Sequence, residues 1–132
     1  MARIRISKTI LDRVAQYEGL KKNLKAFVEA CQNSTHPPRV YKASGISANG
    51  QEYYPYLALD LHHHHLHNNG DPLLITQHVG GDIFGFALTR HADFFQGDKM
   101  QWLKDHAEMI DWTGLETLHR DVMAYNQKSE CC

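Results

Sequence analysis

The amino-acid sequence predicts an α+β protein in which an N-terminal strand and two helices pack on an antiparallel sheet, with a helical extension at the C-terminus. Three observations support this prediction. The first third begins with an alternating segment and continues with apolar residues at helical spacing, the middle has extended segments separated by turn residues, and the last third returns to helical spacing. A chain of 132 residues with 42% hydrophobic residues can bury one core. We therefore expect one α+β domain over residues 1–95 and an extension over residues 96–132 packed on it.

The N-terminal third contains the predicted strand and the two predicted helices. Residues 2–6 alternate between apolar and charged side chains, as in a short strand with one buried face. Ser7 follows and can cap a first helix that continues through Val14. Gly19 is expected to interrupt the helical segment. Apolar residues then recur every three or four positions over residues 20–31, which predicts a second amphipathic helix.

The middle of the chain has the pattern of an antiparallel meander. Loops are expected over residues 33–38 and 43–52, and a turn over residues 68–71, because Pro, Gly, Asn and Ser gather there. Three strands are expected between and after these turns, over residues 57–67, 73–79 and 83–89. The last two are separated by a Gly-Gly-Asp sequence typical of a tight hairpin.

The C-terminal extension shows helical periodicity again. One apolar stripe is formed by Met100, Leu103, Ala107 and Ile110. Residues 113–116 have the sequence Thr-Gly-Leu-Glu, which fits a capping box at the start of a last helix.

Charge is distributed unevenly along the chain. Residues 1–60 carry nine Lys or Arg and five Asp or Glu, a net +4, whereas residues 61–132 carry five and ten, a net −5, which together give the overall −1. Nucleic-acid-binding proteins usually present a basic patch. Any such patch in this protein must come from the first half of the chain, with help from protonated histidines.

The cysteines and the N-terminus predict the compartment. Cys31, Cys131 and Cys132 form neither a CxxC pair nor an even framework, which favours free thiols in a reducing compartment. The N-terminal segment is charged and lacks the apolar core of a signal peptide, and no apolar run is long enough to cross a bilayer. We expect a cytoplasmic protein without a membrane partner.

Histidine is concentrated in one segment. Five of the ten histidines stand at positions 62, 63, 64, 65 and 67, and a sixth is His78. On a strand, His63, His65 and His67 would share one face, and His62 and His64 the other. Such a cluster can supply both a proton acceptor and a proton donor near neutral pH. Alternatively, His63, His65 and His67, or His78 with them, could hold zinc or nickel through neutral imidazoles.

The residues after this cluster resemble a known family. His67-x-x-x-Asp71 is followed by the apolar segment Leu73-Leu74-Ile75, a hairpin, and His91-x-x-x-Phe95. This order resembles the RelE/ParE toxin superfamily, and within it the YafQ-like mRNA interferase toxins of type II toxin-antitoxin systems. The resemblance extends over residues 2–95, because the N-terminal strand and two helices fit it as well.

The resemblance implies a RelE/ParE-like fold and a toxin-like endoribonuclease that cleaves mRNA, usually on the ribosome, and is held by an antitoxin at rest. The implied chemistry needs no cofactor: a base takes the proton of a ribose 2′-hydroxyl, which attacks the adjacent phosphate, and an acid protonates the departing 5′-oxygen. By position, His67 and Asp71 match the turn residues of the catalytic site, His91 the general acid, and Phe95 the aromatic residue of the pocket. We further expect substrate contacts from His63, His65 and Arg90.

Some features depart from the family pattern. Pro72 stands where the family has an aromatic residue, and the segment before the histidine cluster has Tyr53, Tyr54 and Tyr56 where a histidine is expected. Residues 96–132 extend beyond the usual end, where they could cover the sheet, replace antitoxin contacts or form a homodimer interface. Two alternatives to a nuclease therefore stay open, a non-toxic binding protein with a RelE/ParE fold and a metal-binding protein.

Overall fold

A computed structural model describes most of the chain. The described ranges are 3–32, 40–41, 53–67, 70–117, 119–121 and 123–124, and for residues 40, 41, 67 and 70 the description is limited to the backbone. The loops predicted over residues 33–38 and 43–52, residues 68 and 69 of the predicted turn, and the two terminal cysteines lie outside the described residues.

The centre of the protein is a five-stranded sheet with the order β1-β5-β4-β3-β2. Its strands are β1 (Arg3–Ile6), β2 (Val40–Tyr41), β3 (Leu61–His67), β4 (Gly70–Val79) and β5 (Asp82–Thr89). The hairpin predicted between the last two strands is confirmed. The predicted antiparallel meander is confirmed for β3, β4 and β5, but the sheet as a whole is mixed, because β1 pairs with β5 in parallel. No short turn joins these two strands, so nothing in the connection forces them to run in opposite directions.

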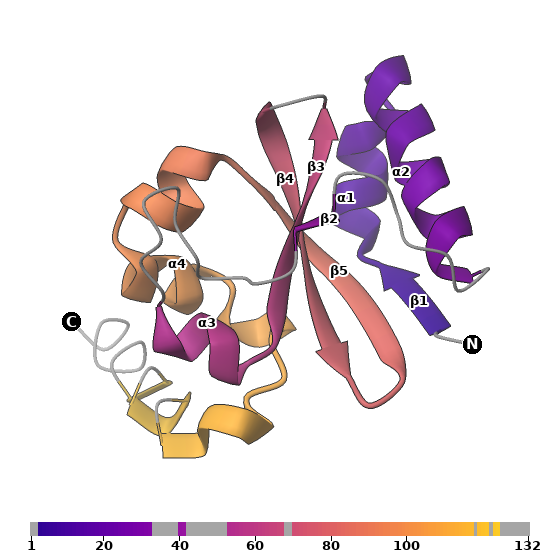
Figure 1. The fold of residues 1–132 in the computed structure, drawn as a ribbon. Helices are drawn as coiled ribbons and strands as arrows, with labels where there is room; N and C mark the ends of the chain where they lie inside the picture. The colour runs from indigo at the N-terminus through magenta and orange to yellow at the C-terminus, as the bar shows by residue number, and fades with distance from the viewer. Residues whose placement is uncertain are drawn as a thin grey trace.

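Two helices follow β1 and cover one face of the sheet (Figure 1). In α1 (Lys8–Val14), the predicted cap is confirmed, because the side chain of Ser7 accepts a hydrogen bond from the backbone N–H of Ile10. The predicted break at Gly19 is wrong by a few residues, since α2 (Glu18–Gln32) already includes this glycine. The chain reverses just before it, where the N–H of Tyr17 donates to the carbonyl of Val14 over 2.9 Å.

A short helix, α3 (Tyr54–Ala58), replaces the first part of the strand predicted over residues 57–67. Pro55 lies in its first turn, a position that proline favours. Tyr56 fixes the helix in the core, because it is fully buried, stacks on Phe94 with ring centroids 4.3 Å apart, and donates its hydroxyl to the Phe94 carbonyl. Asp60 ends the helix with a left-handed φ of 53°, and the strand begins after it.

The C-terminal region covers the opposite face of the sheet (Figure 1). It includes a π-helical turn η1 (Ala92–Gln96), α4 (Lys99–Asp105) and two 3₁₀ turns, η2 (Ala107–Met109) and η3 (Thr113–Leu115). The described residues after η3, over 116–117, 119–121 and 123–124, are helical, as predicted for the last helix. The predicted stripe is interrupted after α4, but Leu103, Ala107 and Ile110 are buried in one cluster with sheet residues. The predicted capping box is wrong, because the carboxylate of Asp111 accepts the hydrogen bonds from the N–H and the hydroxyl of Thr113.

The sheet therefore lies between two helical layers, and its strands alternate between two cores. Leu66 and Leu74 face α1 and α2. Leu61, Leu73 and Ile75 face η1 and α4. Within β3, His62 and His64 consequently share the face of Leu66, and His63 and His65 share the face of Leu61, as the alternation predicts. The two groups of histidines have different neighbours.

Gln77 connects the sheet to the C-terminal region. Its side chain is 3% exposed, donates to the carbonyls of Leu59 and Asp111, and accepts from the N–H of Asp111. Gln77→Leu should lower the free energy of unfolding by about 2–3 kcal/mol, because the backbone groups lose their partners inside the protein. Urea denaturation measures this, with Gln101→Leu as a control, since the Gln101 side chain is exposed and donates to the exposed carboxylate of Asp105. Equal effects of the two substitutions would contradict the anchoring role of Gln77.

Candidate active site

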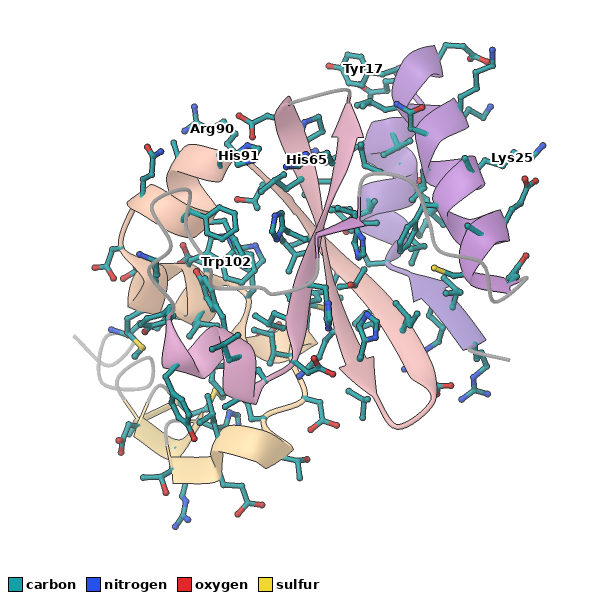
Figure 2. All side chains as sticks on the ribbon, in the orientation of Figure 1. Tyr17, Lys25, His65, Arg90, His91 and Trp102 are labelled. Atoms are coloured by element: carbon teal, nitrogen blue, oxygen red, sulfur yellow. The ribbon has the colours of Figure 1, made fainter. Side chains whose placement is uncertain are left out.

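Three titratable side chains come together at the end of the sheet where β3 ends and β4 begins. Strand pairing aligns His65 with Leu73 and Leu73 with Thr89. Two residues further along, Asp71 lies at the start of β4 and His91 follows the end of β5. Figure 2 shows His65 and His91 side by side at this end of the sheet, with Arg90 on the outer side. The structure thus unites residues separated by up to 26 positions in the sequence.

The three side chains form a continuous hydrogen-bonded chain. One oxygen of Asp71, Oδ1, accepts from the backbone N–H of His91 over 2.7 Å and lies 2.9 Å from its Nδ1. The other ring nitrogen of His91, Nε2, lies 3.0 Å from Nε2 of His65. An ionised carboxylate can only accept, so Nδ1 of His91 carries a proton. The two Nε2 atoms then share a single proton, which sits on one ring and is accepted by the other.

Phe95 and His63 support this chain from the inside. The Phe95 ring lies 4.9 Å from that of His63 at an angle of 81°, and 6.1 Å from that of His91. The His63 and His65 rings are 5.7 Å apart. The outer side is open, because the side chains of His91 and Asp71 are 35% and 42% exposed. A substrate can therefore approach His91 from solvent, and the aromatic ring of Phe95 lies on the inner side of the site.

Burial decides what His63 can contribute. Desolvation, and after it the nearby imidazoles of His65, His91 and His62, lower the pKa of His63 to about 3. A neutral, buried imidazole offers no positive charge to a phosphate. We therefore assign His63 a supporting role beneath His65, in place of the substrate contact expected from the sequence.

Arg90 has an acidic partner next to the candidate site. Its guanidinium bonds to both carboxylate oxygens of Asp93, at 2.9 and 3.2 Å. The pairing raises the pKa of Arg90 and lowers that of Asp93. Both side chains are exposed, so the pair is weak and a phosphate can compete for the guanidinium. The expected substrate contact by Arg90 requires this exchange of partners.

His67 stays a prediction. Its backbone pairs with Gly70 at the end of β3, after a shift in the strand register. Its side chain lies outside the described part of the structure. The catalytic role expected for His67, and a metal site that includes it, therefore rest on the sequence alone.

The opposite face of β3 contains a different histidine. His64 is 4% exposed, its Nε2 lies 2.9 Å from the Thr76 hydroxyl, and its ring packs 4.4 Å from that of Phe27 in α2. Burial lowers the pKa of His64 well below its ordinary value. His64 is a neutral core residue beneath α2, and this explains its presence in the histidine run.

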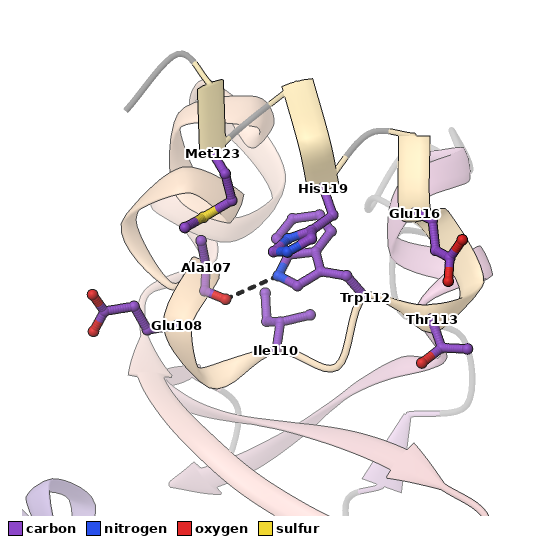
Figure 3. A pocket seen from close by; sticks show the side chains of 8 residues that line it. All are labelled: Ala107, Glu108, Ile110, Trp112, Thr113, Glu116, His119 and Met123. Carbon is purple, nitrogen blue, oxygen red and sulfur yellow. Dashed lines mark hydrogen bonds between the residues drawn. The ribbon is translucent and has the colours of Figure 1, made fainter. Parts of the chain in front are cut away.

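A cavity of about 380 Å³ opens at the far end of the C-terminal region (Figure 3). Trp112 is one of its lining residues and donates its indole N–H to the carbonyl of Ala107. The titratable side chains along its wall are Glu108, Glu116 and His119. None of the residues of the Asp71–His91–His65 chain lines this cavity, so we do not place the chemistry there.

The sequence named His65, Asp71 and His91 but missed how they connect. It gave Asp71 a role as a turn residue of the site, whereas the structure makes its carboxylate the hydrogen-bond acceptor of His91. Comparison with family models, with curated proteins and with solved structures gives no match. No helix among the described residues is long and apolar enough to cross a membrane. The assignment to a toxin family and the cytoplasmic location stay predictions.

Proposed function

We propose that this protein is an endoribonuclease that cleaves mRNA by acid–base catalysis, with no metal in the step. The observation that supports this most is the hydrogen-bonded chain from Asp71 through His91 to His65. A carboxylate that orients an imidazole, which in turn touches a second titratable group, is an arrangement typical of proton transfer catalysts.

The proposed step uses the proton shared by the two Nε2 atoms. In the reactive state His91 holds the proton and His65 is neutral, so His91 is the acid and His65 the base. A phosphate enters between the rings and replaces their direct hydrogen bond. His65 removes the proton of the 2′-hydroxyl, the 2′-oxygen bonds to phosphorus, and His91 protonates the 5′-oxygen as its bond to phosphorus breaks. The products are a 2′,3′-cyclic phosphate and a 5′-hydroxyl.

The contact between Nε2 of His65 and Nε2 of His91 also returns the proton to His91. After the step, His65 is protonated and His91 is neutral. Once the products leave, the rings come back within 3.0 Å, and the proton passes from His65 to His91 without a water molecule between them. Asp71 orients this return, because its contact with Nδ1 of His91 keeps Nε2 of the same ring directed at His65. We therefore assign Asp71 the role of a positioning residue.

The distribution of charge in the protein affects how RNA can bind at the site. Arg90 is paired with Asp93, and residues 61–132 carry a net charge of −5, so little positive charge surrounds the site. Free RNA would bind weakly to such a surface. We propose that mRNA reaches the site while the ribosome holds it, and that an antitoxin covers the site at rest, as the resemblance implies.

Expression in bacterial cells tests this function. Induction of the wild-type protein should arrest growth and create new mRNA 5′ ends within translated regions, whereas His91→Ala should do neither, because the acid is lost. His106→Asn is the control, since His106 lies outside the site and an asparagine can still donate to the Trp102 carbonyl that its Nδ1 contacts. Normal growth and unchanged mRNA ends with the wild-type protein would refute the proposal and favour a non-toxic binding protein.

A further inference from the structure

A second group of titratable side chains lies at the other end of β3, on the face shared with α1 and α2. Asp60, which precedes β3, His62 in β3 and His78 in β4 each offer one ligand atom, and these three atoms lie within 4.8 Å of one another. Nε2 of His62 is 2.8 Å from Oδ1 of Asp60. The rings of His62 and His78 are 4.0 Å apart. None of the three belongs to the proposed catalytic chain.

The backbone holds the three residues in register. His62 pairs with Thr76, so His78, two residues further along β4, lies diagonally across from His62 on the same face. The N–H of His78 donates to the carbonyl of Asp60, which places these two residues opposite each other. Asp60 itself has a left-handed φ of 53°, a conformation that aspartate and asparagine adopt more readily than most residues other than glycine.

One atom of the group lacks an explanation within the protein. Nε2 of His78 is buried and has no hydrogen-bond partner among the described residues. A buried polar atom without a partner is unfavourable in a folded protein, and a missing ion is one of the ordinary reasons for it. Nε2 is also an ordinary ligand atom of a neutral histidine.

We propose that Asp60, His62 and His78 bind one divalent transition-metal ion, with Zn²⁺ as its most suitable occupant. Two imidazoles and one carboxylate are a common donor set for this ion. Ligand atoms around tetrahedral Zn²⁺ lie about 3.4 Å apart, given bonds of about 2.1 Å. The Asp60–His62 contact of 2.8 Å must therefore widen by about 0.6 Å, and the longest separation, at most 4.8 Å, must shorten by up to about 1.4 Å, which side-chain rotation can provide.

The site leaves room for further ligands. The Asp60 side chain is 59% exposed and that of His62 is 21% exposed, so one side of the group faces solvent. Water or a bound molecule would complete the coordination there. This set differs from the metal site expected from the sequence, because His63 and His65 point to the opposite face of the sheet.

Metal binding to the purified, untagged full chain tests the proposal. After removal of metal with a chelator, titration with Zn²⁺ should show one tight site, and elemental analysis after passage over a chelating resin should find about one Zn²⁺ per chain. His78→Ala and Asp60→Asn should weaken binding by more than about 100-fold, since even outer partners of ligands change affinity by 10- to 100-fold. Asparagine tolerates positive φ, so Asp60→Asn removes the charge and keeps the backbone conformation.

His65→Ala is the matched control, because it removes a histidine of the same run from the opposite face. It should keep the full stoichiometry and affinity. Wild-type protein without stoichiometric Zn²⁺ would overturn the proposal, and so would binding that survives both His78→Ala and Asp60→Asn. Either result leaves the proposed nuclease function intact, because the two groups share no residue.

Discussion

His91→Ala should cleave RNA about 10²- to 10⁴-fold more slowly than the wild-type protein, the range expected when a general acid is removed. The loss is expected because His91 is the middle residue of the hydrogen-bonded chain Asp71–His91–His65. Its Nδ1 contacts Asp71 and its Nε2 contacts His65. Its half-exposed position means that truncation removes little packing. The measurement is the initial rate of cleavage of a defined mRNA in a translating extract.

The comparison needs a control for folding. His106→Asn should keep the wild-type rate, and thermal unfolding of His91→Ala should resemble that of the wild type within a few degrees. A His91→Ala protein that folds and still cleaves at more than about a tenth of the wild-type rate would show that His91 is not the acid.

Asp71→Asn should reduce kcat by about 10²- to 10⁴-fold and leave KM nearly unchanged. Oδ1 of Asp71 is the partner of both the backbone N–H and Nδ1 of His91, and the amide oxygen of asparagine can keep both contacts. The substitution therefore removes the negative charge beside the ring that acts as the acid and keeps the position of the ring. A comparable loss occurs in serine proteases when the aspartate that orients the histidine becomes asparagine.

Steady-state kinetics of Asp71→Asn separates positioning from a merely structural role. A structural defect would raise KM or lower the fraction of active protein, whereas loss of the negative charge lowers kcat alone. A rise in KM with kcat preserved would contradict the role of Asp71. The backbone N–H of His91 can still donate to the asparagine oxygen, so the loop position itself should survive the change.

Much of the fold follows from the sequence, and the exceptions have physical causes. The β4–β5 hairpin and α2 were predictable, because alternation and helical periodicity are both clear there. Helix α3 was not, since Leu57 and Leu59 alternate like strand residues, and the helix is fixed by the stacking of Tyr56 on Phe94, which is distant in sequence. The parallel pairing of β1 with β5 depends on long-range packing, and no local pattern encodes it.

The candidate site was predictable in its residues but not in its geometry. The resemblance placed Asp71 and His91 in one site, and alternation placed His65 on the correct face. Which ring nitrogen contacts which group depends on the register of β3, β4 and β5, and the sequence does not specify this register. The role of His64 illustrates the same limit, because only the position of Phe27 in α2 shows that this histidine is a core residue.

The register of the sheet also separates the two histidine groups. His62 and His65 are three positions apart, yet one lies beside His78 and Asp60 and the other beside His91. Consecutive histidines in one strand therefore lie on two faces of the sheet, where they have different neighbours and different proposed roles. From the sequence, His78 could be grouped with the run, but its diagonal position across from His62 could not be foreseen.

The most direct test of the central claim is cleavage of two otherwise identical mRNAs in a translating extract, one of which has a single 2′-deoxynucleotide at the mapped cleavage position. The account predicts that the wild-type protein cuts the all-ribose mRNA to give a 2′,3′-cyclic phosphate and a 5′-hydroxyl end, that it leaves the substituted position intact, and that His91→Ala cuts neither. Cleavage at the 2′-deoxy position, or products with a 5′-phosphate, would contradict attack by the 2′-hydroxyl and with it the proposed roles of His65 and His91.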